Sequence, residues 1–392
     1  MKYWTRPFVT AAIFAAASAS ATEIDVMTQN QYLGTDLTPV ITAPPELISE
    51  RVVEALENVA ASLPSERLER LAKMTRDRSP HVLVLNEACA YSCTDLPGTP
   101  ATEGCGNQRI QGAFVDFLAT TESNLAGRYV TKARVRNFAI AGLPFMIDGY
   151  GALLSVEDRD AILVRSDVAA TAAAVPLAAG GCRASLEGCN YLAVPTIPTA
   201  LGDVTIERGY VAVDLLVVGR PYRVFGTHLE VRQIIPGPAG EPTRVLQRLQ
   251  AAELAQTALS FPALPGTQTL VLGDINSDPR DGFDPLPTPI GPLPPPYAIF
   301  ASSGFTDVWT LRPGAVNGKG APLVGFSCCQ DEDLANHRSG LYERIDIIFS
   351  LAAPKRVKDA RLLGASVADK TWPRGLGLWP SDHASVAARL QF

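Results

Sequence analysis

The sequence is poor in histidine, methionine and tryptophan, with four of each among 392 residues. The histidines are scattered and no two cysteines have zinc-finger spacing, which argues against a structural zinc site. The formal charge is −6, so the chain has no excess of basic residues to hold nucleic acid through bulk charge. A bound divalent metal supplies positive charge locally, however, so action on nucleic acid is not excluded. Intrinsic disorder is excluded because 47% of the residues are hydrophobic.

Long apolar runs are missing beyond the first twenty residues, so no later stretch is predicted to cross a bilayer as a helix. At the start of the chain, two basic residues precede the apolar run 8–19, and the small residues 19–21 have the pattern of a cleavage site. We expect residues 1–21 to be a secretory signal peptide, because the alternative, a membrane anchor, needs a longer apolar run. Its removal takes away two basic residues and no acidic one, which leaves a charge of −8. We therefore expect an exported protein, periplasmic or secreted.

Seven cysteines are consistent with an oxidising compartment: Cys89, Cys93, Cys105, Cys182, Cys189, Cys328 and Cys329. Cys182 and Cys189 flank a short polar loop, and we predict that they form a disulfide. The first three lie in another loop and pair either among themselves or with the adjacent Cys328 and Cys329. Because the number is odd, at least one thiol is free or forms an intermolecular bond.

Apolar, β-branched runs that end in a polar residue recur along the chain and predict buried strands: EIDVMTQN, HVLVLNE, DAILVRS, YVAVDLLVV, YRVFGTHLE, TLVLGDIN and RIDIIFS. Residues 44–80 have helical periodicity with a break at Pro64, which predicts two helices, and residues 243–261 predict a third. The proline-rich region 279–296 is expected to be a long surface loop. Strands that alternate with helices, together with consecutive strands, predict a single α/β domain with mixed sheets over residues 22–392.

Polar residues gather at the ends of these strands: Asn30, Glu87, His228, Asp274 and Asn276, with Asp346 inside the seventh strand and Asp382 and His383 opening the last segment. In layered α/β folds the strand ends converge on one rim, where ligands bind. Carboxylates, carboxamides and histidines gathered there would suit a phosphate and a hard cation, Mg²⁺, Mn²⁺ or Ca²⁺.

Each of these residues also has a simpler explanation when taken alone. Glu87 suits a capping carboxylate, and Asp274 and Asn276 lie in a run of turn-forming residues. His228 suits a core histidine, and Asp382 suits a helix N-cap before an apolar run. The order of the whole set is what favours a functional site.

That order resembles the endonuclease/exonuclease/phosphatase superfamily, which includes deoxyribonuclease-like and neutral sphingomyelinase-like phosphoesterases. The matching motifs span nearly all of residues 22–392: MTQNQYLG, VLVLNE, DRDAILVR, FGTHLE, VLGDIN, ERIDIIF and SDH. The resemblance implies a four-layer α/β sandwich of two mixed β-sheets flanked by helices. It also implies metal-dependent hydrolysis of a phosphate ester, with Mg²⁺, or Mn²⁺ or Ca²⁺, as cofactor.

The resemblance further implies roles for the strand-end residues. Glu87 would be the principal metal ligand, with Asp382 and Asn30 near the metal or the phosphate. His383 would be the general base or bind the scissile phosphate, and Asp346 would hold its tautomer.

The remaining roles concern water and the leaving group. Asp274 and Asn276 would orient the attacking water and a phosphoryl oxygen. His228 would stabilise the phosphate or protonate the leaving oxygen, with Asp158 as its carboxylate partner. Arg208 would contact the phosphate.

The substrate class is less determined by the motifs. Because THLE resembles the lipid-directed and phosphatase branches, we expect a phosphodiester substrate, with lipid ahead of nucleic acid, transient contact with a membrane surface and no obligate protein partner. The alternatives are a secreted non-specific endonuclease and a non-catalytic binding or toxin subunit on the same fold.

Overall fold

Apolar strand sequences build two sheets in the computed structural model, which describes residues 22–173, 183–184, 188–199, 202–232, 241–260, 264–314, 325–372 and 377–392. The expected signal peptide and Cys182 lie outside the described residues. None of the helices in the described part of the chain is both long and apolar enough to cross a membrane.

The first sheet has seven strands in the order β16-β17-β1-β2-β5-β3, with β4 paired to β5. Strands β1 and β2 are parallel, and the other pairs are antiparallel, so the sheet is mixed. Its strands are β1 (Glu23–Asn30), β2 (Val82–Asn86), β3 (Ala90–Asp95), β4 (Tyr129–Ile147), β5 (Tyr150–Arg165), β16 (Arg356–Leu363) and β17 (Ser385–Gln391).

The second sheet has eight strands in the order β14-β15-β13-β12-β11-β8-β7, with β6 paired to β11. Here β12 and β13 are the parallel pair, as expected for strands joined through a helix. Its strands are β6 (Ala169–Ala172), β7 (Arg183–Ala184), β8 (Cys189–Asn190), β11 (Gly209–Val217), β12 (Arg220–His228), β13 (Gln268–Asp274), β14 (Thr306–Asp307) and β15 (Asp346–Ser350). Strands β9 (Thr196–Thr199) and β10 (Gly202–Thr205) form a separate two-stranded sheet.

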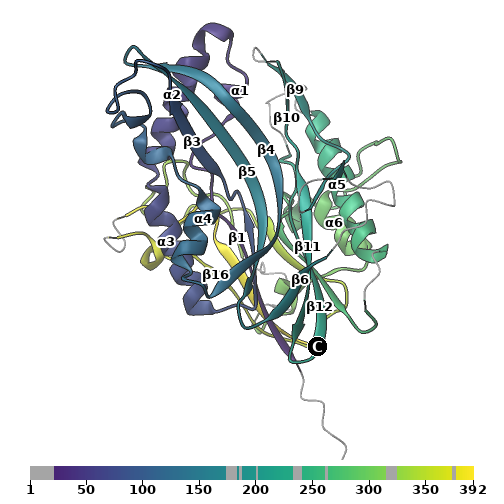
Figure 1. Cartoon of the computed structure of the whole chain (residues 1–392). Coiled ribbons are helices and arrows are strands. Elements are labelled where there is room, and N and C mark those ends of the chain that lie inside the picture. Colours follow the sequence, from purple (N-terminus) through teal and green to yellow (C-terminus); the bar gives the residue numbers. More distant parts are fainter. Residues whose placement is uncertain are drawn as a thin grey trace, which may run out of the picture.

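Helices lie on the two outer faces (Figure 1). On the side of the first sheet are α1 (Thr38–Ile41), α2 (Ile48–Ala61), α3 (Pro64–Arg78) and α4 (Phe117–Asn124), and on the side of the second are α5 (Glu241–Ser260) and α6 (Pro296–Ser302). Short 3₁₀ turns are Pro45–Leu47, Gly104–Gly106, Gln111–Ala113, Pro279–Asp281, Val308–Leu311 and Val367–Asp369.

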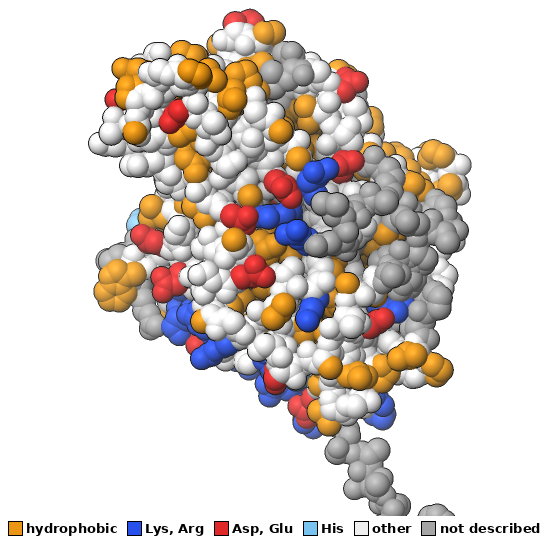
Figure 2. Space-filling view, in the orientation of Figure 1, with side chains coloured by type: hydrophobic (Ala, Val, Ile, Leu, Met, Phe, Trp, Pro, Cys, Tyr) orange, Lys and Arg blue, Asp and Glu red, His pale blue; other side chains and the backbone are white. Residues whose placement is uncertain are grey.

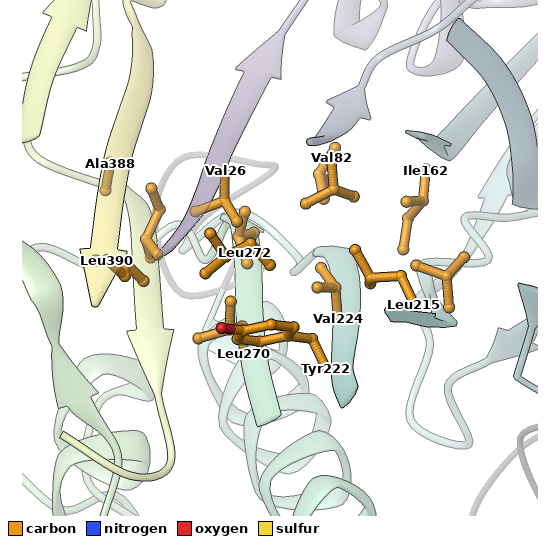
Figure 3. Packing of buried hydrophobic residues seen from close by; sticks show 14 of the residues in the cluster. Val26, Val82, Ile162, Leu215, Tyr222, Val224, Leu270, Leu272, Ala388 and Leu390 are labelled. Atoms are coloured by element: carbon orange, nitrogen blue, oxygen red, sulfur yellow. The ribbon is translucent and has the colours of Figure 1, made fainter. Parts of the chain in front are cut away.

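The core between the two sheets is built from β-branched and leucine side chains. Val26 and Ile162 of the first sheet belong to the same buried cluster as Leu215, Val224 and Leu272 of the second (Figure 3). Strand β2 is also apolar on its other face, where Leu83 and Leu85 belong to a second buried cluster, which explains its continuous apolar run. The layers are thus helix, sheet, sheet, helix, and the predicted four-layer α/β sandwich is confirmed.

The expected helices are present, with one difference at the end of the chain. Helix α2 ends at Ala61 and α3 begins at Pro64, as the break predicted, because proline suits the first turn of a helix. Asp382 does not cap a helix, since the segment after it is strand β17. The proline-rich region 279–296 is mostly loop, with a 3₁₀ turn at its start.

The described disulfides join Cys93 to Cys105 and Cys328 to its neighbour Cys329. Pairing within the first loop was one of the two predicted options, whereas the bond between adjacent cysteines was not foreseen. Among the described cysteines, Cys89 has a free thiol, which is buried. Cys189 is disulfide-bonded, but its predicted partner Cys182 lies outside the described residues, so that pairing stays a prediction.

Candidate active site

Strand register brings three of the predicted residues into one row across the second sheet. His228 at the end of β12 pairs with Asp274 at the end of β13, which in turn pairs with Asp346 at the start of β15. In the first sheet, Asn30 pairs with Asn86, so Glu87 follows directly at the same rim. The two sheets therefore present their polar strand ends to one another.

A cleft of about 480 Å³ opens at this rim. Eight of the ten predicted site residues line it: Glu87, Asp158, Arg208, His228, Asp274, Asn276, Asp382 and His383. The other two, Asn30 and Asp346, are hydrogen-bonded to residues of the lining. The structure thus brings all ten together.

His383 and Asp346 form a buried hydrogen-bonded pair. Asp346 Oδ2 lies 2.7 Å from His383 Nδ1, and the hydroxyl of Ser381 accepts a hydrogen bond from the backbone N–H of His383. Burial by itself lowers the pKa of His383, but the carboxylates of Asp346 and Asp382 outweigh it and hold this pKa well above its usual value. The other ring nitrogen, Nε2, is 3.8 Å from Asp274 Oδ2.

Asp274 lies at the centre of the site. Its Oδ1 accepts a hydrogen bond from the backbone N–H of Asn276, at 2.8 Å. Its Oδ2 lies 3.6 Å from Nε2 of His228 and 3.8 Å from Nε2 of His383. Burial, and then the charge of Asp346, raise the pKa of Asp274 to about 6. At neutral pH this carboxylate is ionised. Its raised pKa, close to neutral pH, suits a group that accepts a proton during catalysis.

Glu87 occupies a constrained position immediately after β2, with a φ of 54°. Asn30 Nδ2 donates to its Oε1 at 2.9 Å, and the backbone N–H of Leu33 donates to its Oε2 at 2.8 Å. Asn30 Oδ1 accepts a hydrogen bond from the backbone of Tyr32, so the amide nitrogen of Asn30 faces the carboxylates. Asn30 was expected near the metal or the phosphate, and a direct bond to the metal does not fit this geometry, because only its oxygen could bind a cation. Asn30 instead holds Glu87 in place.

Arg208 stands where a carboxylate was predicted beside His228. Arg208 Nη1 lies 3.1 Å from His228 Nδ1 and 4.0 Å from Asp158 Oδ2, so the prediction that Asp158 partners His228 is wrong. A guanidinium only donates hydrogen bonds, so His228 Nδ1 is the acceptor and Nε2 carries the proton. Burial, and then the charges of Arg208 and His383, lower the pKa of His228 well below its usual value. His228 is therefore a neutral imidazole whose N–H faces Asp274.

The donor set fits a hard divalent cation. Burial, and then the charges of Asp382 and Asp158, raise the pKa of Glu87 to about 7. A cation placed among these carboxylates would remove the repulsion, and their oxygen atoms are ligands that Mg²⁺ prefers. Asp274, Asp346 and His383 also lie close enough together to hold a metal. However, the hydrogen bond between Asp346 and His383 already occupies one of the atoms with which each residue could bind a metal. Glu87 and Asp382 therefore suit the cation better.

Two supporting residues were missed in the sequence. Asn86 joins the sheets, because its side chain accepts a hydrogen bond from the backbone of Asp274 and donates to Asp160 and to the carbonyl of Thr227. Its place at the end of a strand, directly before Glu87, was a usable signal. Glu230, fully buried 3.5 Å from an Arg208 nitrogen, ends the run YRVFGTHLE just as Glu87 ends HVLVLNE, so the same signal was present there.

Comparisons with known proteins give likenesses of structure only. No family model and no curated protein matches the sequence. An endonuclease/exonuclease/phosphatase from Beutenbergia cavernae is 18% identical, with 95% of this chain and 72% of that chain covered and a TM-score of 0.45. A family protein from Bacteroides thetaiotaomicron is 15% identical over 95% and 99% of the two chains, with a TM-score of 0.48. D. rerio TDP2 complexed with a single-strand DNA product is 16% identical over 94% and 98%, with a TM-score of 0.42.

Proposed function

We propose that the chain is a divalent-metal-dependent phosphoesterase of the endonuclease/exonuclease/phosphatase superfamily that hydrolyses a phosphodiester with activated water. The observation that carries the proposal is the position of Asp274 Oδ2, within 4 Å of the Nε2 atoms of both His228 and His383 and in the same cleft as Glu87. A proton acceptor between two hydrogen-bond donors, beside a set of cation ligands, has the parts that hydrolysis of an anionic ester needs.

The roles follow from which atoms carry protons. Asp274 is ionised at neutral pH, so its Oδ2 orients a water molecule and accepts its proton. His383, whose Nδ1 is bound to Asp346, presents Nε2–H to the phosphoryl oxygens. His228, held neutral by burial and by Arg208, donates a second hydrogen bond there, so of its two expected roles we propose stabilisation of the phosphate and not protonation of the leaving oxygen.

The metal site is assigned to Glu87 and Asp382. A divalent cation bound there supplies positive charge that stabilises the phosphoryl group. Asn30 and the backbone of Leu33 fix the orientation of Glu87, and Asn276, whose amide donates to the carbonyl of Leu229, orders the cleft next to Asp274.

The test is hydrolysis by the purified protein with Mg²⁺, Mn²⁺ or Ca²⁺. Bis(p-nitrophenyl) phosphate, sphingomyelin vesicles and plasmid DNA serve as substrates, with a chelator as the metal control. Asp274→Asn keeps the shape of the side chain but not its basicity, and it is expected to lower kcat by at least a hundredfold. Asp281→Asn, a change of the same kind outside the cleft, is the matched control. Absence of turnover on all three substrates by the folded protein would refute the proposal and favour a binding subunit.

Lipid is proposed ahead of nucleic acid as the substrate, because the described lining of the cleft has seven acidic residues and one arginine. On the face shown in Figure 2, acidic side chains lie next to basic ones near the middle, without a broad basic surface. Faster cleavage of plasmid DNA than of vesicles would instead identify a non-specific endonuclease. Export is proposed from the N-terminal pattern and from the disulfides. Its test is fractionation of cells that express the full chain, in which residues 1–21 should be missing from the exported protein.

A further inference from the structure

We infer that the disulfide between Cys328 and Cys329 positions the adjacent site residues Asp382 and His383, so that the enzyme works at its full rate only while this bond is oxidised. The inference rests on the proposed function and adds a positioning group to it. Both cysteines line the catalytic cleft together with Asp382 and His383. Cys328 also lies opposite His383 in an antiparallel backbone bridge. The disulfide is therefore part of the wall of the site.

Backbone hydrogen bonds join the segment that contains the disulfide to the segment that contains His383. The carbonyl of Ser327 accepts a hydrogen bond from the backbone N–H of Ala384, at 2.7 Å. The backbone N–H of Gln330 donates a hydrogen bond to the carbonyl of Asp382, at 2.9 Å. These two bonds lie on either side of the disulfide in one segment and on either side of His383 in the other. The position of His383 therefore depends on the spacing between Ser327 and Gln330.

The segment with the disulfide is also joined to the residues around Asp346. The hydroxyl oxygen of Ser327 accepts a hydrogen bond from the backbone N–H of Asp346, at 3.1 Å. Cys328 and Glu343 exchange backbone hydrogen bonds, at 3.0 and 2.9 Å. Asp346 and His383 are far apart in the sequence, yet their side chains meet at 2.7 Å. A single segment thus holds the backbones of both partners of this pair.

A disulfide between adjacent residues closes a small ring that includes the peptide bond between them. Rotation about the backbone bonds inside this ring is restricted, so Ser327 and Gln330 keep the spacing that their hydrogen bonds need. Reduction opens the ring and frees these rotations. Fixing the backbone of one residue reduces the population of the fixed conformation by a factor of roughly 5–30. We therefore expect the reduced segment to hold Asp382 and His383 in their working positions for a smaller share of the time.

The bond is open to chemical reduction from the cleft. Cys328 is buried, but Cys329 is partly exposed, and both line the cleft. A dithiol supplies two electrons and two protons: the S–S bond breaks, two cysteine thiols form, and the dithiol becomes a disulfide itself. Exchange with an oxidised disulfide reverses the reaction. Because oxidising compartments keep such bonds closed, the inference links activity to the compartment that the proposed export would reach.

The experiment compares the purified protein before and after reduction with dithiothreitol, which is removed by gel filtration under argon before the assays. Alkylation and mass spectrometry report which cysteines are reduced. Hydrolysis of bis(p-nitrophenyl) phosphate gives kcat, and electron paramagnetic resonance gives the affinity for Mn²⁺ without substrate. We expect reduction of Cys328 and Cys329 to lower kcat by about fivefold to thirtyfold and to weaken Mn²⁺ binding by at least about fivefold. Treatment with oxidised glutathione should restore both values.

Serine variants identify the disulfide that is responsible. The double variant Cys328→Ser, Cys329→Ser should have the lowered kcat and Mn²⁺ affinity without any reductant, and should not respond to reduction. The double variant Cys93→Ser, Cys105→Ser removes another disulfide and is the matched control. It should have the values of the wild type when oxidised and should lose them on reduction, as the wild type does. Circular dichroism checks that each form is folded at the assay temperature.

The outcomes separate this inference from the proposed function. Unchanged kcat and Mn²⁺ affinity in the folded Cys328→Ser, Cys329→Ser variant would overturn the inference and leave the proposed function intact. A lower melting temperature with no change in either value would also overturn it, because the bond would then serve stability alone. If the oxidised protein hydrolyses no phosphodiester, the proposed function fails, and the Mn²⁺ affinity still decides the inference: a loss on reduction supports it, and no loss overturns it.

Discussion

Replacement of Arg208 by methionine should destabilise the protein in a strongly pH-dependent way. Arg208 lies 3.5 Å from Glu230, whose side chain is fully buried and has one carboxylate oxygen without a hydrogen-bond partner. Without the guanidinium, Glu230 is a buried carboxylate that must either stay charged or take up a proton. Protonation of a carboxyl group with an ordinary pKa of about 4.3 costs about 3.7 kcal/mol at pH 7 and about 1 kcal/mol at pH 5. These values are the expected losses of unfolding free energy in Arg208→Met.

Urea denaturation of the wild type and the variant at both pH values measures these losses. The double variant Arg208→Met, Glu230→Gln removes the charge that was left alone, so most of the stability at pH 7 should return. Asp203→Met, which introduces methionine at an exposed position of β10, controls for the new side chain. A loss in Arg208→Met that is equal at pH 5 and pH 7, or no recovery in the double variant, would refute the reasoning.

Three further predictions concern stability. Burial lowers the pKa of His81 to about 4, so between pH 6.5 and pH 4 this side chain is neutral in the folded protein but protonated in the unfolded chain. The unfolding free energy should therefore fall by about 1–2 kcal/mol over that range, after allowance for partial exposure. His81→Asn should remove this part of the dependence in urea titrations, and an unchanged slope would contradict it. Asn86→Leu leaves buried polar groups unpaired and should cost about 2–4 kcal/mol by the same assay, whereas a cost under 1 kcal/mol would show that Asn86 does not join the sheets. Serine at both Cys93 and Cys105 should lower the melting temperature by opening a short loop, at a cost of about 2–3 kcal/mol, and an unchanged melting temperature under non-reducing conditions would contradict this.

The order of strands and helices was predictable from the sequence because each element has a clear local pattern. Strand β2 is apolar on both faces, and the proline at position 64 separates two amphipathic helices. The site residues were also found, since polar side chains at the ends of buried strands have few structural explanations when they occur together.

The pairing of side chains within the site was not predictable, because it depends on register between strands far apart in the sequence. Asp158 of β5 was assigned to His228, but the pairing of β4 with β5 has several irregularities that the sequence does not reveal. Arg208, the residue directly before β11, contacts His228 instead. Asn30 was assigned to a metal, yet only the three-dimensional structure shows which end of its amide faces Glu87.

The pairing of β1 with β17 has a consequence for when activity begins. Glu23 is opposite Gln391, so strands from the two ends of the described chain are neighbours, and β17 follows directly on Asp382 and His383. A nascent chain that has not yet reached Asp382 lacks both residues, and it also lacks the strand that pairs with β1. Under the proposed function, every chain shorter than this has an incomplete site, so the topology would keep such unfinished copies inactive.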